Sequence, residues 1–294
     1  MNIGILTRSA SGWASSKLIE ATRNLGHNPY PFSFGDIIIH LENGQAKILT
    51  RDLDLISDVP AIIVRPIGRS TLEEAIFRLD ILYTLEDYGV KVVNSASSIE
   101  KAVDKYRTLH ILSKHGIPVP DTLVSENPNL AFKNLDLLGR NIVIKPLFGS
   151  RGLGSTMLSD RDTIWRVIQH LAYIRNVIYL QRYLEHYHRD IRAFIVGGRV
   201  IAAMIRENPT SWKTNIARGA RPKPIKLKGE LEELAIKSAE ILGCEVAGVD
   251  ILMHNGNPYV LEVNSQPTWK GLQSVTRVNI AEEIVKYVIS EVKK

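Results

Sequence analysis

Two carboxylates and an amide, Asp250, Glu262 and Asn264, stand in a segment whose pattern is typical of a β-hairpin. Residues 249–267 read VDILMHNGNPYVLEVNSQP, with apolar residues in both arms and an Asn-Gly pair between them. Carboxylates that face each other across a hairpin repel unless a cation lies between them. Mg²⁺ prefers oxygen ligands and completes its shell with water and phosphate oxygens. The segment therefore predicts a metal-nucleotide site; the alternative is the solvated face of an antiparallel strand.

The metal prediction depends on the length of the hairpin loop. A three-residue loop at 255–257 pairs His254 with Pro258 and places Asp250 directly opposite Glu262. A side chain two residues further along a strand lies on the same face, as the third ligand must. A two-residue loop would instead place the two acids on opposite faces and remove the argument.

A glycine-rich stretch, FGSRGLGS at residues 148–155, could lay backbone N–H groups against phosphate oxygens. It lacks the Gly-Lys-Ser/Thr of a Walker loop and the Gly-x-Gly-x-x-Gly of a dinucleotide-binding turn, and its flanks have the pattern of strands. Lys145 ends the apolar run before it, where an ammonium would meet such phosphates. The alternatives are a flexible hairpin loop and a lysine that reaches solvent from a strand end. By periodicity, Lys105 is a solvated helix residue.

Composition limits the class of protein. The chain has 294 residues, of which 45% are hydrophobic and 23% charged, as in soluble globular proteins. No apolar run is long enough to span a membrane and the first residues lack a signal pattern, so we expect a cytoplasmic protein. The net charge of +6 raises a nucleic-acid partner, but the basic residues are interleaved with 31 acids, which suits small anionic substrates at least as well. The single cysteine, Cys244, is expected in a core.

The pattern of elements changes along the chain. The N-terminal third alternates short apolar runs with helical patterns, which predicts a parallel sheet covered by helices. A new helix is expected over 97–116, with a capping box formed by Ser97 and Glu100 and a C-terminal cap at Gly116. From residue 141 onward, strands dominate where the glycines and charges gather, which indicates two α+β lobes.

Seven segments in this order resemble one known family: AVDKYRT, VIKPLFGSRGLGS, LQRYLE, DIRAFIVGGRVIAA, WKTNIARGA, GVDIL and YVLEVNSQP. They resemble the ATP-grasp enzymes, specifically the RimK-like α-L-glutamate ligases, from about residue 97 to the end. The resemblance implies an α/β and α+β fold in which two α+β lobes enclose ATP. It implies a pre-ATP-grasp domain at 1–96, a central lobe with a glycine-rich lid at 97–180 and a C-terminal lobe with a magnesium site at 181–294.

The resemblance also assigns roles to single residues. It places the α- and β-phosphates on two lysines, the triphosphate under the lid, the adenine beside 182–184 and the ribose near Asp190. The implied nucleotide contacts are Lys105, Lys145, Gly149, Ser150, Arg151, Gly152, Gly154, Ser155, Arg182, Tyr183, Leu184, Asp190, Lys213 and Asn215. The implied ligands of Mg²⁺ or Mn²⁺, with two ions expected, are Asp250, Glu262 and Asn264.

The implied reaction joins a carboxylate to an amine. ATP phosphorylates the carboxylate, and the amine attacks the resulting acyl phosphate to form an amide, with the protein supplying position and charge. Arg192 and Arg218 are candidates for holding the phosphoryl group and the substrate carboxylate; the alternative is that each is an ordinary ion-paired arginine. No protein nucleophile is needed.

The implied substrates are L-glutamate and an acceptor, either a coenzyme such as a tetrahydromethanopterin-type pterin or a protein tail such as that of a ribosomal protein. The alternatives are an amino-group carrier protein of lysine or arginine synthesis as acceptor, and a regulator that binds nucleotide without turnover. A homo-oligomer is expected. Trp269 would stack on a planar acceptor or lie in the core, and Arg65 and Arg69 would grip an acidic acceptor or stay solvated.

Overall fold

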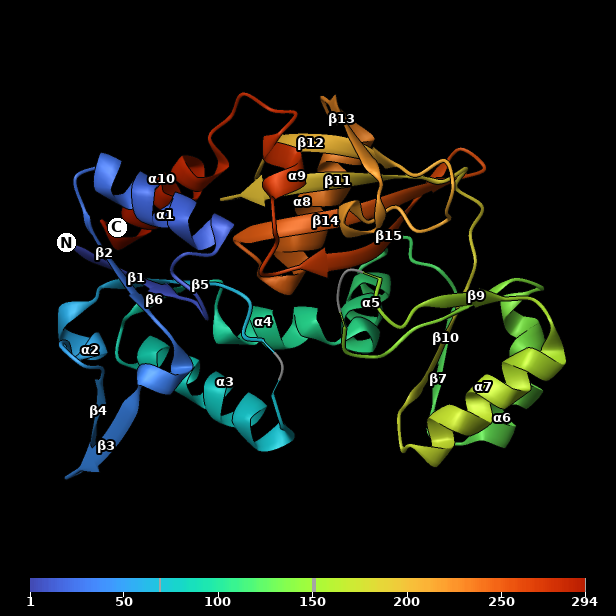
Figure 1. Ribbon diagram of the computed structural model, residues 1–294, viewed down its shortest axis with the longest axis horizontal. Helices are drawn as coiled ribbons and strands as arrows, with labels where there is room; N and C mark the ends of the chain where they lie inside the picture. Colours follow the sequence, from blue (N-terminus) through green and yellow to red (C-terminus); the bar gives the residue numbers. More distant parts are fainter. Residues whose placement is uncertain (69, 150–151, 294) are drawn as a thin grey trace.

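The computed structural model describes residues 1–68, 70–149 and 152–293, and four β-sheets lie within them (Figure 1). The predicted site residues Arg69, Ser150 and Arg151 lie outside the described residues. Within these ranges, no helix is both long enough and apolar enough to cross a membrane.

The first sheet is parallel, as the alternating pattern predicts. It consists of β1 (Asn2–Leu6), β2 (Asn28–Phe32), β5 (Ala61–Val64) and β6 (Lys91–Val93), in the order β2-β1-β5-β6. The strand β5 is buried along its whole length. Because side chains alternate between faces, Ala61 and Ile63 enter one core while Ile62 and Val64 enter another.

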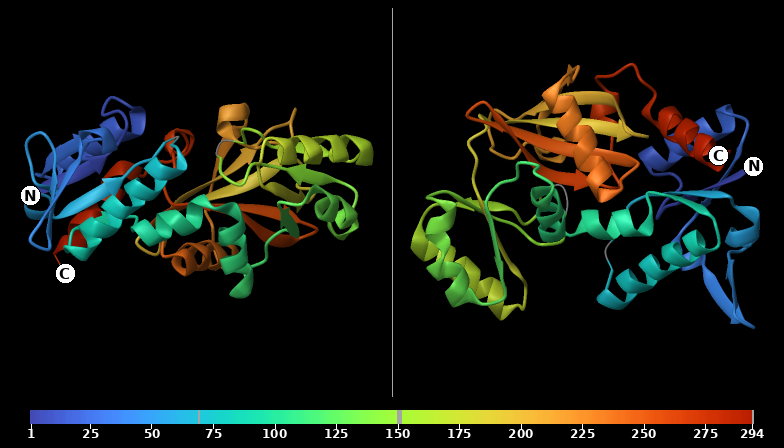
Figure 2. Two further views of the ribbon diagram at one scale, coloured as in Figure 1. Left: turned by 90° about the horizontal axis from the view of Figure 1, so that it is seen from below. Right: turned by 180° about the vertical axis from the view of Figure 1, so that it is seen from behind.

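Helices cover both faces of this sheet. The helices are α1 (Trp13–Asn24) and α10 (Ile280–Val292) on one face and α3 (Leu72–Asp87) on the other. The helices α1 and α10 lie side by side, so segments from opposite ends of the sequence complete one core (Figures 1 and 2). A two-stranded hairpin, β3 (Ile38–Glu42) and β4 (Gln45–Leu49), and the short helix α2 (Leu55–Asp58) complete the region.

The predicted helix over 97–116 is two helices, α4 (Ala96–Val103) and α5 (Lys105–Lys114). Asp104 interrupts it with an extended backbone, and its side chain accepts a hydrogen bond from the backbone N–H of Arg107 as the N-cap of α5. The break places Lys105 at the first position of α5. Its side chain therefore does not lie on the solvated helix face that periodicity predicts.

Of the two predicted helix ends, the N-terminal capping box is wrong and the C-terminal glycine is confirmed. The expected capping box of Ser97 and Glu100 is wrong: α4 is capped two residues earlier by Ser95, and Glu100 accepts a hydrogen bond from Tyr83 instead. Gly116 follows α5 with a φ of 76°, which confirms it as the residue that ends the helix.

The second sheet is antiparallel and carries the glycine-rich loop. Its strands are β7 (Thr122–Ser125), β10 (Ile178–Arg182), β8 (Ile142–Ile144) and β9 (Thr156–Leu158), in that order, covered by α6 (Pro128–Lys133) and α7 (Arg161–Tyr173). The strands β8 and β9 pair with each other, so the loop joins two strands as the flanking sequence predicts.

The third sheet forms the C-terminal part of the fold. Its strands are β13 (Arg221–Ile225), β12 (Arg199–Glu207), β11 (Arg189–Val196), β14 (Val246–His254) and β15 (Asn257–Asn264), in that order and antiparallel. The helix α8 (Glu230–Leu242) covers one face (Figure 2), and the short helix α9 (Lys270–Gln273) follows β15. Cys244 is buried in the core under α8, as expected.

The domain limits at 96/97 and 180/181 stay predictions. Residue 180 lies within β10, which pairs on both sides with strands of the second sheet. The helix α10 belongs by sequence to the third region but packs on the first sheet.

Candidate active site

In the hairpin of β14 and β15, the two acids pair as predicted, but the turn differs from the predicted one. The expected three-residue loop is wrong: the turn is Asn255 and Gly256, with φ values of 50° and 82°, and His254 pairs with Asn257. This is the two-residue turn that favours Asn-Gly. On its own it would place the two acids on opposite faces.

A β-bulge restores the alignment. Ile251 pairs with Val260, but the next pair along the ribbon is Asp250 with Glu262, so Leu261 is the extra residue. The predicted pairing of Asp250 with Glu262 is therefore confirmed. Asn264 lies two residues beyond, opposite Gly248, and its side-chain N–H donates to the Glu262 Oε1 over 3.0 Å.

Two arginines hold Asp250 from neighbouring strands. Arg192 lies opposite Asp250 in the sheet and makes a two-point contact with it, through Nε to Oδ1 and through Nη2 to Oδ2 at 2.8 Å. Arg206 Nη2 lies 2.9 Å from the same Oδ2 and also makes a two-point contact with Asp190. These four side chains are at most 10% exposed, so they form a buried network.

The network shifts the pKa of both carboxyls in the hairpin. Burial would raise the pKa of Asp250, but the guanidinium groups of Arg192 and Arg206 outweigh it and hold this pKa at about 2. Burial and the nearby charge of Asp250 raise the pKa of Glu262. A divalent cation between them would reverse the second shift, because it favours the ionised form.

Sequence reasoning missed Arg206. It pairs directly with Asp190 across β11 and β12, in the segments DIRAFIV and RVIAAMIRE. The available signal was the set of charged residues inside otherwise apolar strands, which must be paired if they are buried.

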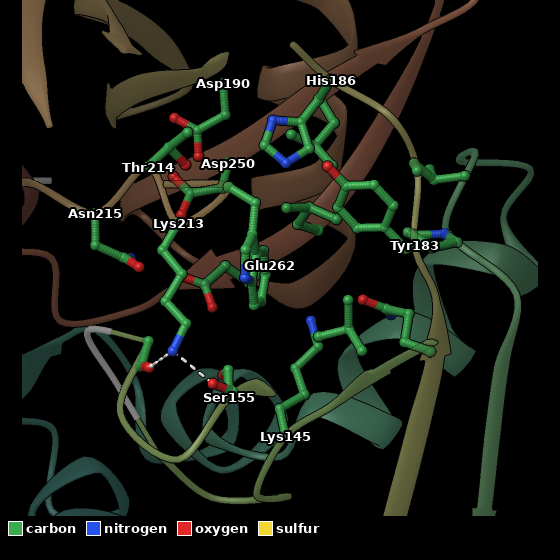
Figure 3. A pocket seen from close by; sticks show the side chains of 18 of the residues that line it. Lys145, Ser155, Tyr183, His186, Asp190, Lys213, Thr214, Asn215, Asp250 and Glu262 are labelled. Carbon is green, nitrogen blue, oxygen red and sulfur yellow. Dashed lines mark hydrogen bonds between the residues drawn. The ribbon is translucent and has the colours of Figure 1, made fainter. Parts of the chain in front are cut away.

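Three lysines line the same pocket as the hairpin acids, namely Lys105, Lys145 and Lys213, and Figure 3 labels the last two. Lys145 lies with its ammonium 5.9 Å from the centre of the Tyr179 ring, and burial lowers its pKa to about 8. Lys105 donates to the backbone carbonyls of Leu147 and Gly149, each over 3.1 Å. Lys145 was predicted from its position before the loop and Lys105 from the family resemblance. Both line the same pocket.

The third lysine, Lys213, ties the glycine-rich loop to the C-terminal region. Its ammonium donates to the carbonyl of Gly152 over 3.4 Å and to that of Ser155 (Figure 3). Gly152 has a φ of 64°, and a Cβ there would lie 2.5 Å from the Asn215 Oδ1. Only glycine therefore fits this approach without a shift of Asn215.

The remaining wall of the pocket is apolar and aromatic. Tyr183 and Trp212 meet edge to face with ring centres 6.2 Å apart, and His186 lies against Tyr183. Leu184 is buried beside them, while Arg182 is exposed and pairs with Asp121 over 3.2 Å. Besides Arg206, sequence reasoning missed several polar and aromatic residues of the pocket, among them Gln181, His186, Trp212 and Thr214. An aromatic slot of this kind accommodates a planar base.

Several predicted residues lie elsewhere. Arg218 is exposed at the end of the short helix η3 (Ile216–Arg218) and does not line the pocket. Trp269 is 1% exposed and packs edge to face against Trp13, so the core alternative holds. Arg65 is buried against the Trp269 ring, so the solvated alternative is wrong, while contact with an acidic acceptor stays a prediction.

The residues present fit a nucleotide with a divalent cation. Asp250 and Glu262 line the pocket and supply carboxylate oxygens, with the Asn264 amide beside Glu262 though not among the lining residues, while three lysines supply positive charge. Among the described residues, no group of three His, Cys, Asp or Glu side chains forms a metal cluster by itself.

Comparison with protein families decides the classification. The RimK PreATP-grasp domain matches residues 1–99 and the RimK-like ATP-grasp domain matches residues 102–288. The chain belongs to the RimK-like ATP-grasp family. It is accordingly an ATP-dependent ligase that forms C–N bonds, and the predicted fold is confirmed.

Individual RimK-like relatives extend over nearly the full chain. The tetrahydromethanopterin:α-L-glutamate ligase of Methanosarcina acetivorans is 32% identical, over 97% of this chain and 98% of the relative. The α-aminoadipate–LysW ligase LysX of Sulfurisphaera tokodaii is 30% identical over 96% of each. The solved ATP-grasp ligase PsnB, in complex with precursor, Mg and ADP, shares the fold with a TM-score of 0.77 at 21% identity, covering 100% of this chain and 98% of that one.

Proposed function

We propose that this RimK-like protein adds L-glutamate to an acceptor, with a tetrahydromethanopterin-type pterin as the first candidate. The single observation that carries the proposal is the pocket in which the Asp250–Glu262 pair faces three lysines. The relatives named as tetrahydromethanopterin:α-L-glutamate ligases from Methanosarcina acetivorans and Methanococcus maripaludis support the choice of acceptor. A ribosomal protein tail is the second candidate.

Each wall of the pocket has a proposed task. Lys105 and Lys145 bind the α- and β-phosphates, and the described glycines of the loop, with Ser155, lie over the triphosphate. Tyr183, Leu184 and Trp212 enclose the base. The ribose lies towards Asp190 in this arrangement, although Asp190 is also fully engaged with Arg206. Lys213 and Asn215 reach the phosphates from the opposite side of the loop.

Asp250, Glu262 and Asn264 would hold magnesium or manganese, and we propose two ions. When bound, the metal would offset the negative charge of the phosphates. The side chain that needs least rearrangement is Glu262, which is 35% exposed, whereas Asp250 is engaged with two arginines. Glu262 would therefore be the acid able to hold an ion with the smaller change in its present contacts.

The positively charged side chains around the reacting groups would do the remaining work. Arg192 Nη1 lies over Gly248, where a Cβ would come within 2.4 Å of it, so this glycine makes room for the guanidinium. We propose that Arg192 orients the phosphoryl group and the substrate carboxylate, since a planar fork fits both. Neither arginine is among the residues that line the pocket, and Arg218 stays the weaker candidate because it is exposed, whereas Arg192 contacts Asp250.

One alternative acceptor is favoured by an observation, whereas the alternative of a nucleotide-binding regulator is not. The similarity to LysX supports an amino-group carrier protein as the acceptor. A nucleotide-binding regulator would be expected to lose a phosphate lysine or a metal acid, and the chain keeps all of them. We further propose a cytoplasmic homo-oligomer; the lone buried Cys244, which cannot form an intramolecular disulfide, suits a reducing compartment.

A phosphate-release screen tests the proposed function. The protein is incubated with ATP, Mg²⁺ and L-glutamate and with a pterin, a ribosomal protein tail peptide or an amino-group carrier protein. We expect phosphate release and a mass gain of one glutamyl residue on the pterin. A mass gain on the carrier protein alone would replace the pterin proposal. If no acceptor causes phosphate release, the result would favour the regulator. Glu262→Gln is the inactive control.

A further inference from the structure

The side chain of Asn94, the residue after β6, is buried between the first sheet and the third. It is 1% exposed. Its Oδ1 accepts a hydrogen bond from the backbone N–H of Val246 over 2.8 Å, and its Nδ2 donates to the carbonyls of Val246, over 2.6 Å, and of Ser265. Each polar atom of the amide is thus paired, as burial requires.

These contacts continue the third sheet beyond the end of β15. The last pair of β14 with β15 is Gly248 with Asn264. An uninterrupted antiparallel ladder would next bond Val246 to Gln266, two residues further along each strand. Asn94 takes that position, because its amide bonds both the N–H and the C=O of Val246 as a backbone peptide group would. The chain can therefore leave the sheet directly after Asn264 without leaving Val246 unpaired.

Two further contacts from the first region hold the residues that follow Ser265. The backbone N–H of Ile67 donates to the Gln266 Oε1 over 3.3 Å, and Arg65 Nη1 donates to the carbonyl of Pro267 over 3.0 Å. Three successive residues of the C-terminal region thus accept hydrogen bonds from the segments that follow β5 and β6. The contact with Ser265 is the one nearest to the proposed metal ligands.

The side chain of Asn264 is oriented within the ribbon of β14 and β15. Its Nδ2 donates to the carbonyl of Gly248 over 3.3 Å and to the Glu262 Oε1 over 3.0 Å. Both N–H directions are used, and the described residues provide no donor to its Oδ1. This orientation leaves the amide oxygen, the type of atom that Mg²⁺ prefers, available to an ion. It depends on the backbone at the end of β15, where Asn94 holds the next residue.

We propose that Asn94 is a positioning residue for metal binding, which fixes the Asn264 amide oxygen by holding Val246 and Ser265 at the end of the ribbon. This inference rests on the proposed function, in which Asn264 is a ligand of Mg²⁺ or Mn²⁺. The RimK PreATP-grasp domain, residues 1–99, in this way contributes to the metal site, although no described residue before Lys105 lines the pocket.

Binding of Mn²⁺ in the presence of ADP, followed by electron paramagnetic resonance, tests this role without turnover. Outer-shell residues that orient a metal ligand typically contribute 10- to 100-fold to affinity, so we expect Asn94→Ala to raise the apparent Kd of Mn²⁺ about 10-fold. Asn264→Ala, which removes the proposed ligand itself, should raise it at least as much.

Ser98→Ala distinguishes positioning from a general loss of stability. Ser98 is 1% exposed, and its Oγ donates to the carbonyl of Gly243, at the end of α8, over 2.6 Å. Its loss therefore also breaks a buried bond between the first and third regions, but not one at residues 264–267. Both Asn94→Ala and Ser98→Ala should lower the midpoint of urea unfolding, and only Asn94→Ala should change the Kd of Mn²⁺. Equal Kd changes in the two variants would overturn the proposal.

A double variant shows whether Asn94 acts through Asn264. The effects of coupled residues are not additive, so Asn94→Ala combined with Asn264→Ala should bind Mn²⁺ no more weakly than Asn264→Ala alone. Additive losses would contradict the proposed route. If Asn94→Ala does not fold, Asn94→Ser replaces it with the same expectation, because its shorter side chain cannot bond both Val246 and Ser265.

The role of Asn94 and the proposed function can fail separately. Weaker Mn²⁺ binding in Asn264→Ala with unchanged binding in Asn94→Ala overturns only the role of Asn94. Unchanged binding in both variants removes the metal assignment of Asn264 and the role of Asn94 with it. If Mn²⁺ binding changes as expected while none of the acceptors gains a glutamyl residue, the role of Asn94 is supported and the proposed acceptors are refuted.

Discussion

The two walls of the nucleotide pocket are held in different ways. The wall formed by β11, β12, β14 and β15 contains a buried network in which Asp190, Arg206, Asp250 and Arg192 satisfy one another. On the phosphate side of the pocket, the half-buried lysines Lys105 and Lys213 instead donate to backbone carbonyls at the glycine-rich loop, Lys213 from the C-terminal region itself. Among the described residues, carboxylates pair the charges of the network, whereas no carboxylate pairs these lysines.

The difference indicates which end of the site is formed before a ligand arrives. A fully paired buried network fixes its members, because separating them leaves unpaired charges in a medium of low dielectric. A lysine bound to a carbonyl can exchange it for a phosphate oxygen and gain from the exchange, since the new partner is charged. The metal end is therefore preorganised, and the phosphate end acquires its final contacts from the nucleotide.

Asp250→Asn should have the largest effect, since it breaks the paired wall. It leaves Arg192 and Arg206 with one carboxylate fewer, so the free energy of unfolding should fall by about 3–5 kcal/mol, together with loss of turnover. Urea unfolding measures the first effect. The matched control is Asp136→Asn, which removes an ion pair with Arg161 at the surface and should change stability little. Equal stability losses would contradict a special network at Asp250.

Glu262→Gln separates chemistry from stability on the same wall. Because burial and Asp250 raise the pKa of Glu262, a neutral amide resembles its protonated form and should leave the unfolding midpoint nearly unchanged. Mg²⁺-dependent phosphate release should fall by roughly 10²- to 10³-fold, the scale of losing a charge-stabilising group. Full activity in this variant would remove the metal assignment.

The lysine wall should respond to pH. Lys145 is charged below its pKa of about 8 and neutral above it, so nucleotide binding that needs the charge must weaken as the pH rises. For a single group, ADP affinity without metal should fall about eightfold between pH 7.5 and 9. Calorimetry in the presence of EDTA measures this. Lys145→Met should bind weakly without this pH dependence, whereas the exposed Lys228→Met should behave as wild type. The same slope in Lys145→Met would assign the titration to another group.

Gly152→Ala should have the smallest effect. The φ of 64° costs about 1–2 kcal/mol for alanine, and the new Cβ displaces the Asn215 amide, so the KM of ATP should rise about 10-fold. Gly116→Ala also imposes a positive φ, of 76°, but no atom lies within 4 Å of its Cβ. Its KM of ATP should not change. A rise of equal size in both variants would show that strain, rather than contact with Asn215, is responsible.

The alternating elements of the first sheet and the strand flanks of the glycine-rich loop could be predicted from the sequence, because local hydrophobic patterns specify them. The face shared by Asp250 and Glu262 was predicted through the wrong loop, and a bulge at Leu261 corrected it. A bulge inserts one residue without any change in the apolar pattern, so periodicity cannot detect it.

Features that depend on contacts across the fold could not be predicted. The partner of Arg206 is set by the pairing of β11 with β12, and the carbonyl partners of Lys105 and Lys213 by the path of the loop. The break at Asp104 is a case where local rules were available, since an aspartate before a helical run is a good N-cap. The apolar spacing continues on both sides of Asp104, so the pattern predicted one continuous helix.

The contact between α1 and α10 constrains when the protein can fold during synthesis. One face of the first sheet is covered by a helix that the ribosome makes some 250 residues later, which at 5–20 residues per second is a delay of roughly 10 to 50 seconds. Until then Ile3, Ile5 and Ile63 lack part of their cover and are exposed to chaperones. Stop codons or ribosome stalling before residue 280 should therefore yield chains that aggregate, even though every residue proposed to handle the nucleotide is already present.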